Sequence, residues 1–144
     1  MSQPSDAYLQ TQVLTASPQR LRLMLIERAL REIELTERHW DEHQPEQALE
    51  SLIRCRDIIS ELIAGIRQGE SPLAQKVLGL YLFLFQALTE AQLSRDPSKL
   101  AIVRRILTSE RDTWQQVCQQ LAEVSTAVAA GGELTPIAPL ALEA

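Results

Sequence analysis

The chain has 144 residues and a formal net charge of -5 at pH 7, which suits one acidic domain. Apolar residues make up 45% of the chain, and it holds only 5 glycines and 7 prolines, so collagen-like and low-complexity folds are excluded. A nucleic-acid-binding protein usually carries more basic than acidic residues. This chain has 14 basic and 19 acidic residues, so we expect no nucleic-acid partner.

The N-terminus and the cysteines indicate the compartment. Residues 1–6 lack the basic and apolar regions of a secretory signal. Cys55 and Cys118 stand alone in apolar segments, which predicts two packed thiols in a reducing compartment. The longest apolar run, Val77 to Phe85, is far shorter than the roughly 20 residues of a membrane-spanning helix. We therefore expect a soluble, cytoplasmic protein without membrane insertion.

Four prolines divide the chain at near-equal intervals: Pro18, Pro45, Pro72 and Pro97. Proline is favoured at the first position of a helix, where its missing N–H costs no hydrogen bond. The residues before three of them are good N-caps (Ser17, Ser71 and Asp96), whereas Gln44 is a poor one. These signals predict four helices, over about residues 18–43, 45–68, 72–94 and 97–124.

Apolar residues recur with helical spacing in these segments. In the second segment the stripe steps by four and three residues through Ala48, Leu52, Cys55, Ile59, Leu62 and Ile66. Short connections between long helices favour antiparallel neighbours. The sequence therefore predicts one all-α domain over 1–144, an antiparallel up-down four-helix bundle over about 17–124. We expect a mobile N-terminal arm over 1–16 and a mobile C-terminal tail over 125–144.

The third predicted helix is apolar on every side. Besides its main stripe it carries Leu78, Leu82 and Phe85, spaced i, i+4, i+7. A bundle helix needs only one broad apolar stripe, so the excess predicts either an interaction surface or a thick core covered by the two chain ends. The tail, a second copy of the chain or a client could cover this stripe. The candidate partner-binding residues on the second and third helices are Ile58, Ile59, Leu62, Ile63, Leu80, Tyr81 and Leu84.

Candidates for chemistry are few. His39 and His43 are spaced i, i+4, as two zinc ligands on one helix face can be, but no cysteine or third histidine is near in sequence. We interpret them as solvated histidines at a helix C-terminus. No nucleotide-binding or hydrolase motif is present, and carboxylates alternate with arginines as on a solvated helix face. We expect no catalytic residue, no metal and no cofactor, and hence no enzyme. The alternative is a small bundle enzyme that handles a metal or phosphate, which a metal analysis of the purified protein would test.

Short motifs follow one another along most of the chain. They are Ala7-Tyr8 with Val13 to Pro18, Ile53 to Leu62, Leu80-Tyr81 with Glu90-Ala91, and Trp114. Their order and spacing, from about residue 7 to 120, resemble those of the flagellar secretion chaperone FliS family. The chain departs from that pattern in the third helix, where Tyr81-Leu82-Phe83 replaces a step resembling Tyr-Asp-Tyr and Gln86-Ala87 replaces two arginines.

The resemblance implies a four-helix bundle that binds the disordered C-terminal segment of flagellin. Such binding would prevent premature polymerisation in the cytoplasm and deliver flagellin to the flagellar export gate. The resemblance also implies that the N-terminal arm covers part of the binding groove until the client displaces it. Tyr8, Val13 and Leu14 are the arm residues that we expect to do so. The alternative is a bundle that forms a homodimer, or binds a different helical client, through its apolar stripes.

Overall fold

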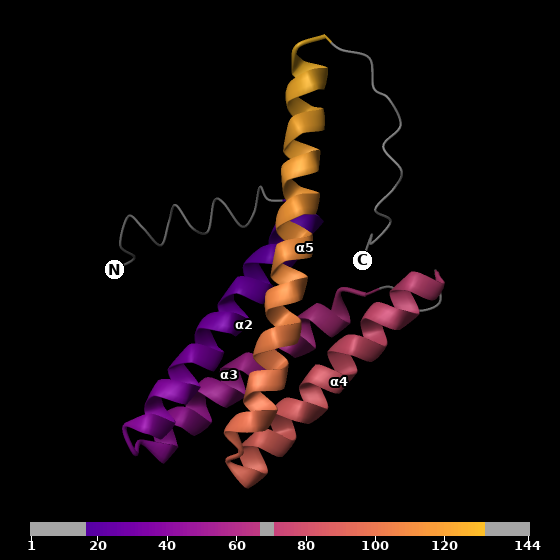
Figure 1. Cartoon of the computed structure of the whole chain (residues 1–144). Coiled ribbons are helices and arrows are strands. Elements are labelled where there is room, and N and C mark those ends of the chain that lie inside the picture. Colours follow the sequence, from indigo (N-terminus) through magenta and orange to yellow (C-terminus); the bar gives the residue numbers. More distant parts are fainter. Residues whose placement is uncertain (1–16, 67–70, 132–144) are drawn as a thin grey trace, which may run out of the picture.

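The computed structural model describes residues 17–66 and 71–131. These residues form four helices: α2 (Pro18–Asp41), α3 (Pro45–Ala64), α4 (Pro72–Ser94) and α5 (Pro97–Ala129). Each helix packs against two others, in the cyclic order α2, α3, α4, α5. Successive helices run in opposite directions (Figure 1). The predicted all-α, antiparallel four-helix bundle is confirmed.

Each helix begins at the proline that the sequence marked. The side chains of Ser17, Ser71 and Asp96 accept a backbone N–H of the first turn at 3.2, 3.0 and 2.9 Å. Gln44 makes no such cap, and its Oε1 lies 2.8 Å from His39 Nδ1 instead. The caps matter because the first turn of a helix has N–H groups without a partner in the helix.

Two predicted helix ends were too late and one was too early. α2 ends at Asp41 because His43 takes a left-handed conformation, with φ 56°. α3 ends at Ala64, immediately before Gly65. α5 continues to Ala129, so residues 125–129, predicted to belong to the tail, are helical. The predicted arm and the rest of the tail from residue 132 lie outside the described residues.

The core lies along the axis of the bundle, where all four helices meet. The predicted stripe of α3 is buried throughout. It packs with stripes from the other helices, whose largest fully buried members are Ile26, Ile33, Tyr81, Leu84, Leu88, Leu100, Leu107 and Trp114. The periodicity that predicted the helices thus also identified the inner face of α3, because only that face meets the other helices.

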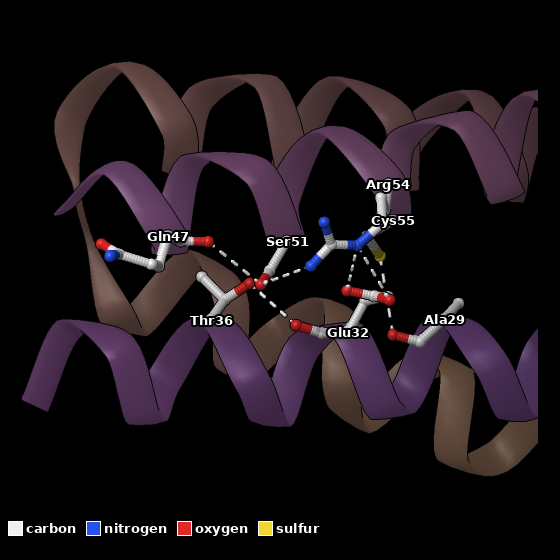
Figure 2. A network of polar contacts seen from close by, with 7 residues as sticks. All are labelled: Ala29, Glu32, Thr36, Gln47, Ser51, Arg54 and Cys55. Atoms are coloured by element: carbon white, nitrogen blue, oxygen red, sulfur yellow. Dashed lines mark hydrogen bonds and ion pairs between the residues drawn. The ribbon is translucent and has the colours of Figure 1, made fainter. Parts of the chain in front are cut away.

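The contact between α2 and α3 carries most of the buried polar groups (Figure 2). Thr36 and Ser51 are fully buried, and each hydroxyl donates to a carbonyl one turn earlier in its own helix, at 2.8 and 3.1 Å. At the edge of the contact, Arg54 Nε lies 3.1 Å from both carboxylate oxygens of Glu32. The Cys55 thiol donates to the backbone of α2 at 3.7 Å. These bonds satisfy the buried hydroxyls and the thiol where the two helices pack together.

α4 is, among the described residues, the one helix that is long and apolar enough to cross a membrane by length and composition. Those two properties do not separate a membrane helix from an apolar helix of a bundle. Here the inner side of α4 carries Tyr81, Leu84 and Leu88, which are fully buried in the core. Only 28% of its most apolar stretch is buried, so apolar side chains also occupy its outer sides.

Candidate partner-binding surface

Most of the predicted partner-binding residues on α3 and α4 lie beneath the surface. Five of those on α3 and α4 are buried in the core: Ile58, Ile59, Leu62, Tyr81 and Leu84. Ile63 and Leu80 are partly buried. Tyr8, Val13 and Leu14 lie outside the described residues. The five buried residues face the other helices, so in this closed bundle a partner meets their outer neighbours first, and direct contact with these five stays a prediction.

The outer neighbours on α3 form a second stripe. Leu49, Ile53, Arg56, Ser60 and Ile63 follow one another at steps of four and three residues, which places them on one side of the helix. Leu49 is 41% exposed and Ile53 is 42% exposed. Two large aliphatic side chains are therefore in water on this side of α3.

The facing stripe on α4 is the one that the sequence singled out. Leu82 is 51% exposed, whereas Leu78 and Phe85 are partly buried and pack against the core. Together the stripes form one surface, which we call the α3–α4 face: Leu49, Ile53, Arg56, Ser60, Ile63, Leu78, Leu82 and Phe85.

Arg56 joins the two stripes. Its guanidinium lies 5.0 Å from the centre of the Phe85 ring, within the range of a cation–π contact. Its Nη1 donates to Gln92 Oε1 of α4 at 2.7 Å, while its Nε is buried without a hydrogen-bond partner. The α3–α4 face is thus a mostly apolar surface with one cation held in its middle. At one end, near Leu49, a hollow of about 480 Å³ opens between α3 and the end of α4.

A smaller apolar area lies on the opposite side of α4, beside α5. Phe83 is 49% exposed and Ile102 is 45% exposed, with Leu80 and Ile106 partly buried. An ion pair between Lys99 Nζ and Glu90 Oε2, 2.9 Å apart, joins α5 and α4. The Lys99 ammonium, which bonds the Glu90 carboxylate, lowers the pKa of that carboxyl group. Apolar side chains therefore flank α4 on both sides.

Sequence reasoning missed Leu49, Ile53 and Ile102. The signal was available, because Leu49, Ile53 and Ile63 repeat at helical spacing beside the core stripe of α3. The same test for a second stripe had identified Leu78, Leu82 and Phe85 on α4. A second apolar stripe does not by itself indicate exposure, since a neighbouring helix can equally cover it.

The two histidines do not come together as a metal site. His39 Nδ1 is 2.8 Å from Gln44 Oε1, and His43 is exposed in the turn after α2. In the described part of the chain, no group of three or more His, Cys, Asp or Glu side chains could hold a metal ion.

Comparison with known proteins gives this surface a context. The family model described as "Flagellar protein FliS" matches residues 1–121 of the chain. The chain belongs to the FliS family of flagellar secretion chaperones. It is similar to the flagellar secretion chaperone FliS of Bacillus subtilis (strain 168), with 32% identity over 116 residues, which is 81% of this chain and 86% of that protein. The FliS family is one of non-enzymatic chaperones.

The family match covers almost the whole bundle but not all of α5. It ends at residue 121, whereas α5 continues to Ala129. The α3–α4 face lies entirely within the part matched to the FliS family. The last turns of α5 and everything after them lie beyond it.

Proposed function

We propose that this FliS-family chaperone binds the disordered C-terminal segment of flagellin on the α3–α4 face. Binding there keeps flagellin from polymerising prematurely in the cytoplasm and assists its delivery to the flagellar export apparatus. The observation that supports this proposal is the exposure of Leu49, Ile53 and Leu82, between 41% and 51%, along two adjacent stripes of one face.

The physical chemistry of the face suits a segment that folds on binding. An amphipathic helix can lay its apolar side into a groove lined by aliphatic and aromatic side chains. Complete burial of an exposed large apolar side chain contributes roughly 1.5–3 kcal/mol, and the half-buried side chains of this face can each contribute about half of that. The entropy cost of ordering a disordered client offsets part of this free energy, but such a client can extend along a long surface. Arg56, held against Phe85, can also meet an acidic group or a helix C-terminus of the client.

Titration calorimetry with a peptide of the flagellin C-terminal segment tests the proposal. We expect binding with a clearly negative heat-capacity change, since apolar surface is buried. Leu82→Asp and Ile53→Asp should each weaken binding by about tenfold or more, because each change removes apolar burial and also places an unpaired carboxylate under the client. Leu121→Asp is the matched control: Leu121 is 41% exposed, like Leu49, but lies near the free end of α5. No binding, a heat-capacity change near zero, or an equal loss with Leu121→Asp would contradict the proposal.

The N-terminal arm enters the proposal as a cover. Tyr8, Val13 and Leu14 are expected to shield apolar surface until flagellin displaces them. Deleting residues 2–14 leaves Ser17, the N-cap of α2, in place. The truncated protein should keep its helix content but bind more of a hydrophobic dye, or aggregate. A truncated protein that is as soluble and as silent to the dye as the full chain would show that the arm covers nothing.

Self-association through the same stripes, or a different helical client, is the alternative. Size-exclusion chromatography over a range of protein concentrations detects a homodimer, and a pull-down from cell lysate shows whether flagellin is the main bound species. A Leu82→Asp variant that loses only its concentration-dependent association would favour the homodimer.

A further inference from the structure

The end of α5 projects beyond the rest of the bundle (Figure 1). α5 has 33 residues, whereas the other helices have 20 to 24. Its core stripe reaches Trp114 and Val117, both buried, and then continues at the same spacing through Leu121, Val124 and Val128. Leu121 is 41% exposed and Val128 is 48% exposed. A stripe that belongs to a bundle core thus runs on for about three turns with no helix of the described residues opposite it.

A hollow accompanies this uncovered stripe. It has a volume of about 500 Å³ and lies between α5 and the start of α2, lined on α5 by Cys118, Leu121 and Val124. Ser17 and Arg20 form its wall on the α2 side. The stripe and the hollow together make a site for an apolar segment, with one cation at the α2 end.

The size of the site argues against a second copy of the chain as its occupant. Leu121, Val124 and Val128 span only about 10 Å of helix. A specific interface between separate proteins usually buries more than about 1,000 Å², which three side chains cannot supply. A segment of the same chain needs far less contact, because its tether gives it a millimolar effective concentration.

The C-terminal segment begins at this site. Gly131 takes a left-handed conformation, φ 81°, and its N–H donates to the carbonyl of Val128 at 3.0 Å, which ends the helix. The sequence beyond it repeats every third residue, with large apolar side chains at Leu134, Ile137 and Leu140 and prolines at positions 136 and 139. A polyproline II segment has three residues per turn, so the three apolar side chains would share one edge.

We propose that residues 133–144 fold back along α5 and cover its last apolar turns with the edge formed by Leu134, Ile137 and Leu140. The lengths agree, since the six steps from Leu134 to Leu140 span about 19 Å in polyproline II and the ten steps from Val128 to Cys118 span about 15 Å of helix. In this direction Leu134 meets Val128, Leu140 meets the hollow beside Cys118, and Glu143 comes within reach of the exposed Arg20.

The proposed cover lies at the edge of the part matched to the FliS family. The match to the FliS family ends at residue 121, so Leu121 is its last residue, and Val124, Val128 and the tail lie beyond it. The tail and the turns it covers therefore work as a pair that is separate from the α3–α4 face, and the proposal does not depend on flagellin binding.

The thiol of Cys118 reports directly on the hollow. Cys118 is partly exposed there, while Cys55, the other cysteine, is fully buried and its pKa is raised to about 12 by burial. Cys118 in the full chain is treated with a thiol reagent, and the modified cysteine is identified by mass spectrometry. A variant that ends at Gly131 should react about fivefold faster, which corresponds to a tail that is docked about four-fifths of the time.

Point variants in the tail show whether its apolar edge docks on α5 or whether the tail only hinders the reagent without docking. Ile137→Ser and Leu140→Ser should each raise the rate, whereas Ala138→Ser, which lies off the apolar edge, should leave it unchanged. Leu140→Cys should form an intramolecular disulfide with Cys118 on mild oxidation, far faster than Ala138→Cys does. Equal rates in the full and shortened chains would overturn the proposal. So would a rate that rises only when residues 2–14 are deleted, or one that falls with increasing protein concentration, since these identify the N-terminal segment or a second copy as the cover.

Discussion

The hydroxyl of Tyr81 in α4 donates a hydrogen bond to Glu110 Oε1 in α5, at 2.9 Å. Glu110 stands at a position of the α5 stripe where an apolar residue would otherwise be expected, between Leu107 and Trp114. Burial raises the pKa of Tyr81, and the Glu110 carboxylate raises it further. The pair therefore joins α4 and α5 through a partly buried polar contact.

Tyr81→Phe should lower the free energy of unfolding by about 1 kcal/mol, because the partly buried Glu110 carboxylate loses its hydrogen-bond donor. Urea unfolding at pH 7 measures the change. A double-mutant cycle with Glu110→Ala isolates the pair, and the coupling should be clearly favourable. If the two single changes add without coupling, the hydrogen bond contributes nothing to stability.

Stability should fall at alkaline pH, partly through Cys55. Burial, with a smaller contribution from the charge of Glu32, raises the pKa of the Cys55 thiol from 9.0 to about 12. The unfolded chain ionises this thiol above pH 9, whereas the folded chain keeps it protonated. Its contribution is thus complete below pH 9 and is lost as the pH rises toward 12, at no more than about 1.4 kcal/mol per pH unit.

Urea unfolding between pH 8 and pH 11 checks this dependence. Cys55→Ala should be less stable at pH 8, because it leaves a small cavity, but should lose stability less steeply as the pH rises. Cys118→Ala, at a partly exposed thiol, is the control and should keep most of the slope. Equal slopes for the parent protein and Cys55→Ala would contradict the assignment.

Leu82 and Leu84 should respond in opposite ways to the same substitution. Leu84 is fully buried, so Leu84→Asp should cost several kcal/mol and unfold the bundle, and the milder Leu84→Ala about 2–5 kcal/mol. Leu82 is 51% exposed, so Leu82→Asp should change the free energy of unfolding by less than about 1 kcal/mol. Thermal melting followed by circular dichroism distinguishes the two; a collapse of the Leu82→Asp melting temperature would place Leu82 in the core.

The turn after α2 offers a stabilising substitution. His43 has φ 56°, a left-handed conformation that glycine adopts without steric cost. His43→Gly should therefore raise the free energy of unfolding by about 0.5–1 kcal/mol. Glu42→Gly, next to it at φ -88°, is the control and should give no gain. A loss of stability with His43→Gly would mean that the His43 side chain makes a contact worth more than the backbone strain.

The four helices and the inner face of α3 could be predicted from the residue pattern alone. A helix start is a local event, in which a proline removes an N–H that has no partner and the residue before it caps the next ones. Pro18, Pro72 and Pro97 with their caps therefore sufficed without any knowledge of the neighbours. The order of the short motifs likewise pointed to the FliS family, to which the chain belongs.

Which apolar residues are left exposed for a partner depends on how the helices pack together. Ile59 and Ile53 have the same side chain on the same helix, yet one is fully buried and the other is 42% exposed. Their difference in exposure depends on where α2 and α4 pack against α3. Helical periodicity alone does not specify those positions. The same holds for α5, whose stripe continues evenly from Val117 to Val128. No helix of the described residues lies opposite its last turns, because α5 extends beyond the other helices (Figure 1), and burial is a property of the whole packing and not of the residue.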